Sequence, residues 1–152
     1  MHRNLSNYKF IMEVQAKLQI GDNNSQIYSK QYNVVNLTCH YARLTSSSRP
    51  NTDARCEHIA MTLVAPDMED LSLYDWYISG EPLNGRVTLD LSDGQAKADG
   101  NGVNLEFEDG YCYAIEEEYH IDGRMRRTVK LSIVADVVTF ESATFKNPYN
   151  ND

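Results

Sequence analysis

Apolar and polar side chains alternate along most of this chain. In six segments the apolar residues fall at every second position, which is the period of a strand that buries one face. These segments cover residues 10–20, 33–41, 59–65, 87–91, 103–115 and 129–137. The alternation predicts roughly seven or eight strands as the main elements of the fold.

Pairs of residues that accept positive φ angles separate the alternating segments. They are Asn84-Gly85, Asp93-Gly94, Asn101-Gly102 and Asp122-Gly123. Each pair suits a tight turn, and a further break is expected at Asp109-Gly110. The clearest predicted hairpin joins residues 111–121 to residues 125–140 through Asp122-Gly123.

One segment departs from the period of two. Leu73, Trp76 and Tyr77 are spaced as neighbours on one helix face, and Asp67 and Gly80 suit the two ends of a helix. We therefore predict one helix at about residues 68–79, with Leu73, Trp76 and Tyr77 as the side chains that anchor it to the core.

One helix among many strands predicts an all-β fold, either a small antiparallel barrel or a sandwich with the helix packed on it. The chain has 152 residues, which is the size of one domain with a full core. Residues 1–9 are expected to be an N-terminal extension, and residues 143–152 an irregular tail.

The charge balance narrows the choice of partners. The formal net charge is −8, whereas proteins that coat nucleic acid need a basic surface. An acidic surface also disfavours binding to an anionic membrane. The N-terminal residues lack the apolar segment of a secretory signal, so we expect synthesis in the cytoplasm and no export by a cleaved signal.

The cysteines and histidines do not predict a metal site. Cys39, Cys56 and Cys112 are widely spaced, and in a protein without a secretory signal they are expected to be reduced core thiols. Cys56 and His58 could ligate a metal, but zinc sites normally need four ligands. The segment 99–104 resembles a calcium loop only superficially, because the glycine at its sixth position is absent.

The sequence contains none of the common catalytic or nucleotide-binding motifs that we sought. The acidic run Glu116-Glu117-Glu118 alternates between the two faces of a strand, so we expect a solvated strand edge. No catalytic residue, cofactor or metal is therefore predicted.

A polar stretch at residues 45–55 lies between two predicted strands. It contains a proline and is too long for a tight hairpin. Loops of this length tend to be either functional or disordered, and composition alone does not decide between them.

Beyond this point the chain resembles the tube proteins of bacterial type VI secretion systems, the Hcp/TssD family, in its Bacteroidetes branch. The resemblance runs over about residues 12–140. It is carried by an ordered set of motifs: residues 16–21, 32–41, Ser48-Arg49-Pro50, residues 71–76, Gly85-Arg86-Val87, and residues 105–113 followed by Glu117 or Glu118. The chain differs from the family in having Gly110 where alanine is usual, and Ser48 where glycine is usual.

The resemblance implies an antiparallel barrel of two packed sheets with the helix at its side. It also implies rings of six copies that stack into a tube, partners in the sheath, spike and baseplate, and possible small effectors inside the ring. Secretion would then occur through the type VI apparatus without a signal peptide. The long loop would reach other copies, through Arg43, Ser48, Arg49, Pro50, Asn51, Asp53 and Arg55.

Two other classes of function remain open on the sequence. One is a free-standing β-barrel binding module or inhibitor, and the other is a small hydrolase or lyase. The assembly state distinguishes the tube subunit from both of them.

Overall fold

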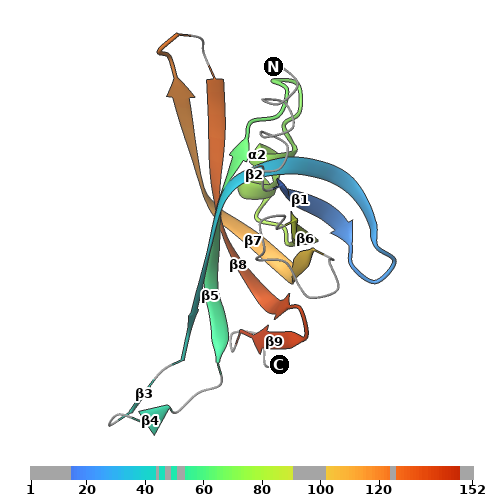
Figure 1. Cartoon of the computed structure of the whole chain (residues 1–152), viewed down its shortest axis with the longest axis vertical. Coiled ribbons are helices and arrows are strands. Elements are labelled where there is room, and N and C mark those ends of the chain that lie inside the picture. Colours follow the sequence, from blue (N-terminus) through green and yellow to red (C-terminus); the bar gives the residue numbers. More distant parts are fainter. Residues whose placement is uncertain are drawn as a thin grey trace, which may run out of the picture.

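The computed structural model describes residues 15–43, 45–46, 49–50, 54–90, 102–123 and 126–147. The strands in these ranges are β1 (Gln15–Asp22), β2 (Ile27–Ala42), β3 (Thr45–Ser46), β4 (Arg49–Pro50), β5 (Arg55–Val64), β6 (Leu83–Asp90), β7 (Val103–His120), β8 (Arg126–Phe140) and β9 (Ala143–Lys146). Helix α2 (Ser72–Ser79) lies between β5 and β6 in the chain (Figure 1).

Seven of the strands form one antiparallel sheet in the order β5-β2-β1-β6-β7-β8-β9. Strand β5 also pairs with β8, from Ile59↔Ile133 to Val64↔Thr128. The sheet therefore closes on itself as a barrel. The all-β antiparallel fold with one short helix, which the alternation predicts, is confirmed.

The long strands change partners along their length. Residues 27–33 of β2 pair with β1, and residues 34–42 pair with β5. Residues 103–110 of β7 pair with β6, whereas pairing with β8 extends to His120. Two arms result, which point in opposite directions (Figure 1). The β7–β8 arm consists of residues 111–120 and 126–131, and the β2–β5 arm of residues 37–42 and 55–59.

The break expected at Asp109-Gly110 is a bend inside the continuous strand β7. Asp109 has a φ of 53°, and the buried face changes from Phe107 before it to Gly110 and Cys112 after it. A Cβ on Gly110 would lie 2.7 Å from the Phe107 ring, so glycine allows the close approach. Tyr111 and Tyr113 consequently point outward, against the simple alternation.

The turn expected at Asn84-Gly85 is also wrong, since both residues lie in β6. A Cβ on Gly85 would lie 2.5 Å from the backbone oxygen of Gln19. The glycine is therefore needed for close packing of strands and not for a positive φ. The hairpin through Asp122-Gly123 is confirmed, since His120 pairs with Arg126 and Gly123 has a φ of 84°. Asp93-Gly94 and Asn101 lie outside the described residues.

Helix α2 begins later than predicted. The Asp67 carbonyl oxygen accepts the Asp70 N–H at 2.9 Å in a preceding turn, and Asp70 Oδ1 accepts the Ser72 N–H at 3.0 Å. The predicted N-cap role of Asp67 is therefore wrong. Gly80 ends the helix in the left-handed conformation, as expected.

The helix packs through a narrower face than the sequence predicts. Leu73 and Trp76 are buried, but Tyr77 is 48% exposed, so its assignment as a core anchor is wrong. The Trp76 indole N–H donates to the Gly110 carbonyl at 2.9 Å, and its ring stacks on Phe107. Because these contacts hold Trp76 against the core, the helix buries the side that carries Leu73 and Trp76. Tyr77 lies at the edge of that side.

The buried core supports the cysteine prediction and corrects the C-terminal one. Cys56 and Cys112 are buried, Cys39 is half-buried, and all three are free thiols. Residues 143–146, expected to be irregular, form β9 against β8, and the Asn147 N–H donates to the Asp136 carbonyl at 2.7 Å. The predicted extension at 1–9 and residues 148–152 lie outside the described part of the chain. No helix among the residues described is long and apolar enough to cross a membrane.

Candidate functional site

The polar stretch at 45–55 lies at the far end of the β2–β5 arm (Figure 1). Strands β3 and β4 form a small ribbon there, in which Thr45 pairs with Pro50 and Ser46 with Arg49. The described residues 45–46 and 49–50 therefore continue the arm as a β-ribbon, although the composition of the stretch is that of an irregular loop.

The predicted contact residues that the structure describes lie at this end of the arm. Arg43 directly follows β2 and is exposed. Arg49 and Pro50 form β4. Arg55 begins β5, and its guanidinium is half-buried and donates to Glu57 Oε2 of the same chain at 3.3 Å. Ser48, Asn51 and Asp53 lie outside the described residues. Arg55 is thus committed within its own subunit and is less available to a neighbour than the sequence suggests.

The histidines of the β2–β5 arm do not build a metal centre. His40 pairs across the strands with His58, and their rings stack with centroids 5.2 Å apart. His40 Nε2 lies 3.3 Å from Glu57 Oε1. Cys56 is buried, and burial raises the pKa of its thiol to about 12. No group of three or more histidine, cysteine or acidic side chains could hold a metal within the described ranges.

A polar cluster joins helix α2 to the β7–β8 arm. Arg127 Nη1 donates to the Tyr74 hydroxyl at 2.9 Å and to Glu117 Oε2 at 3.2 Å, and Nη2 donates to the Pro66 carbonyl at 3.1 Å. The Tyr74 hydroxyl also bonds Glu117. The bonds from Tyr74 and Arg127 hold the pKa of Glu117 below its usual value.

The alternating pattern of the sequence does not predict this cluster. The alternation predicts three solvated carboxylates, but Glu117 differs from Glu116 and Glu118, since it accepts hydrogen bonds from three side chains, those of Tyr74, Tyr119 and Arg127. The i, i+10 relation of Glu117 to Arg127 across the predicted hairpin is the one signal that could have indicated it.

Two strand edges of the sheet have no strand partner among the described residues. Strands β2, β5, β8 and β7 lie side by side in that order, through the β2–β5, β5–β8 and β7–β8 pairings. Residues 34–42 of β2 pair only with β5, and residues 111–120 of β7 pair only with β8, within the part of the chain that the structure describes. Each segment therefore presents one row of backbone N–H and C=O groups without a strand partner there.

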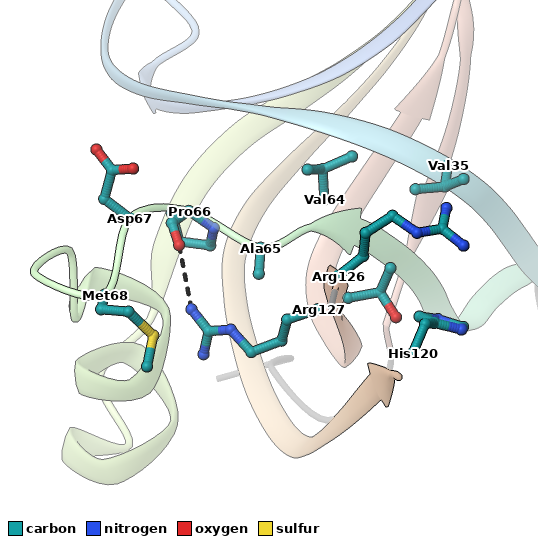
Figure 2. A pocket seen from close by; sticks show the side chains of 10 residues that line it. Val35, Val64, Ala65, Pro66, Asp67, Met68, His120, Arg126 and Arg127 are labelled. Carbon is teal, nitrogen blue, oxygen red and sulfur yellow. Dashed lines mark hydrogen bonds between the residues drawn. The ribbon is translucent and has the colours of Figure 1, made fainter. Parts of the chain in front are cut away.

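Apolar side chains line several hollows of the described surface, and two of these are relevant to function. One is a groove of about 680 Å³ beside the free end of the β7–β8 arm, where His120 pairs with Arg126 (Figure 2). The other is a cavity of about 300 Å³ whose lining is apolar throughout, formed by Leu37, Cys39, Tyr41, Leu89, Leu105, Phe140 and Phe145.

The comparison with protein families decides what kind of protein this is. The family model of the hemolysin coregulated protein Hcp (TssD) matches residues 12–150. The chain belongs to the Hcp (TssD) family. This family comprises the tube proteins of type VI secretion systems, and the resemblance of the sequence motifs is thereby confirmed.

Solved structures share the Hcp fold at low sequence identity. Hcp1 from Flavobacterium johnsoniae is 21% identical, with a TM-score of 0.67, over 88% of this chain and 99% of that one. Another Hcp protein is 13% identical with a TM-score of 0.64, over 90% and 99% of the two chains. A type six secretion system protein is 12% identical with a TM-score of 0.63, over 84% and 83%. A comparison with curated proteins found no match.

Proposed function

We propose that this Hcp protein assembles into closed rings of six copies, which stack to form the tube of a type VI secretion system. The observation that carries the proposal is the pair of open edges on the β2-β5-β8-β7 sheet. One edge belongs to β2 and the other to β7, so the two edges are different surfaces on opposite sides of one sheet.

Such a sheet is suited to head-to-tail assembly. Natural proteins usually cover or break long open edges, because these edges recruit other chains. Pairing the β2 edge of one copy with the β7 edge of the next is a heterologous contact, and repeating it yields either a closed ring or an open helix. The Hcp family membership favours the ring.

The end of the β2–β5 arm would then serve contacts between rings. Arg43 and Arg49 are cations on a chain of net charge −8, so each can meet an acidic surface on another copy, and pairing of this kind favours one register. The tube would be secreted without a cleaved signal, meet sheath, spike and baseplate proteins, and carry small effectors in its lumen.

The mass and shape of the purified protein test the proposal. Light scattering should report six times the subunit mass of 17.3 kDa, and negative-stain microscopy should show rings. A species that stays monomeric at high protein concentration would contradict the tube function.

One observation favours the alternative of a free-standing binding module. The 300 Å³ cavity is lined by apolar side chains, and the Tyr41 and Phe145 rings meet at its wall with centroids 4.7 Å apart. A cavity of that kind suits a small apolar ligand. This alternative predicts a monomer that binds an apolar dye, and Tyr41→Asp, at a lining residue that is 40% exposed, should abolish the binding.

A further inference from the structure

Helix α2 carries apolar side chains on two opposite faces. Leu73 and Trp76 form the inner face and are buried. Leu71 directly precedes the helix, and Ile78 lies seven residues later, two turns along the same face. These two side chains are 56% and 76% exposed. A helix of a small domain normally has one apolar face, so the outer face calls for a partner.

The groove beside the β7–β8 arm could bind such an apolar helix face. Its floor is apolar and includes Val35, Val64 and Met68, all of them exposed. Arg126 reaches across the groove between Val64 and Val35, and His120 lies next to it (Figure 2). The groove therefore combines apolar surface with cationic and imidazole groups, while the acidic Asp67 lies at its far end.

The outer face of α2 matches this groove in chemistry. Asp75 lies one turn before Ile78 and is exposed, so an acidic group accompanies the apolar stripe of Leu71 and Ile78. An eight-residue helix is about 12 Å long, which suits a groove of this volume. Opposite charges beside apolar contacts fix register as well as attraction.

The helix cannot fill the groove of its own subunit. Trp76 is bonded to Gly110 inside the core, and Tyr74 is bonded to Glu117 and Arg127. These contacts hold the outer face of α2 away from the core, so the occupant of the groove must come from elsewhere.

We propose that the outer face of α2 in one copy, with Leu71, Asp75 and Ile78, docks in the groove of the next copy against Val35, Val64 and Arg126. The contact is heterologous, as a ring requires, and the inference rests on the proposed assembly. This docking would be a second contact between neighbouring copies, beside the pairing of strand edges. Asp75 of one copy would form an ion pair with Arg126 of the next.

Substitutions on the two surfaces test the docking, with assembly followed by light scattering over a dilution series. Ile78→Asp should raise the concentration at which rings dissociate by about tenfold or more, because it places a charge in an apolar contact. Ile27→Asp is the matched control. Ile27 is 72% exposed and lies in the β1–β2 hairpin, so this variant should assemble as the wild type does.

A charge exchange gives the second arm of the test. Arg126→Glu and Asp75→Arg should each weaken the rings, and the double variant should recover most of the loss. Circular dichroism should show that the subunits of every variant are folded. If Ile78→Asp unfolds, the charge-exchange variants alone test the docking. Unchanged rings in Ile78→Asp, or no recovery in the double variant, would overturn the docking while leaving ring assembly in place. A wild-type protein that forms no rings would overturn both.

Discussion

Single residues fix the path of the backbone at the points where the barrel is most crowded. Gly85 and Gly110 lie where a neighbouring backbone oxygen or the Phe107 ring leaves no room for a Cβ. Trp76 fills the space that this bend creates, and its indole N–H satisfies the Gly110 carbonyl. The alanine that is usual in the family at position 110 would clash with the Phe107 ring. The stacking of Trp76 on Phe107 therefore depends on glycine at position 110.

Removing the tryptophan should be costly. Trp76→Ala should lower the free energy of unfolding by about 3–5 kcal/mol, because it empties a large buried volume and leaves the Gly110 carbonyl without its donor. Urea denaturation with fluorescence-independent detection, such as circular dichroism, measures the loss. The control is Tyr77→Ala, which should change stability by no more than about 0.5 kcal/mol, since that side chain is half exposed. Equal stability of Trp76→Ala and the wild type would refute the packing role.

The packing of α2 and of Gly85 can be predicted only in part from the sequence. The helical spacing identified Leu73 and Trp76 correctly as inward residues, but it could not show that the bend at Gly110 narrows the buried face and excludes Tyr77. An Asn-Gly pair is a turn signal in a sequence, and only the position of Gln19 shows that Gly85 is a packing residue.

At the scale of elements, the strands follow from alternation because most of them bury one face. Alternation does not predict an element whose structure depends on a partner far away in the chain. Strand β9 and the β3–β4 ribbon are too short to show an alternating pattern, and their pairing depends on neighbours that lie elsewhere in the chain. The cluster of Tyr74, Glu117 and Arg127 likewise joins three elements that are far apart in the chain.

This cluster makes the attachment of α2 depend on pH. The pKa of Glu117 is lowered in the folded protein by its bonds to Tyr74 and Arg127. A carboxyl with a lowered pKa stabilises the fold above its unfolded pKa, and the contribution disappears as the pH falls through the folded value. Glu117→Gln should therefore be less stable than the wild type at neutral pH, and the difference should vanish in acid.

Chemical denaturation at a series of pH values measures this difference. Glu118→Gln is the matched control, because Glu118 is the exposed neighbour and its Oε1 lies 3.9 Å from His120 Nε2, which is beyond hydrogen-bond distance. A difference that persists unchanged into acid would show that Glu117 acts through its shape and not through its charge.

At the scale of the whole molecule, the barrel supplies stability while its extensions supply contacts. The core lies inside the closed sheet and includes side chains from every strand of the barrel and from α2. The free ends of the two arms point away from it in opposite directions (Figure 1), and the outer face of α2 is exposed. Changes in an arm should therefore alter assembly more than folding.

The stretch at 45–55 offers a test of this division. Replacing residues 46–54 with a short Gly/Ser linker should leave the subunit folded, because loop length affects closure entropy by only about 0.6 kcal/mol per doubling. Stacking of rings into tubes should weaken, and Arg49→Glu should act in the same direction more gently. Circular dichroism reports folding, and microscopy reports rings and tubes.

A charge reversal elsewhere serves as the control for Arg49→Glu. Lys146→Glu changes an exposed lysine of β9 and should leave stacking unchanged. Unfolding of the linker variant would place the stretch in the core, and normal stacking would remove Arg49 and Pro50 from the contact between rings.

In the proposed assembly, the open edges of β2 and β7 join neighbouring copies in a closed ring. Cysteine pairs across the two edges test it most directly, with Asn36 or Thr38 of β2 combined with Glu116 or Glu118 of β7, all exposed. On oxidation, at least one double variant should give a ladder of covalent species on a non-reducing gel that ends at six copies, the ring size implied by the family. Each single variant should stay below the trimer. If rings are seen by microscopy and no pair gives a ladder, the edges do not form the contact.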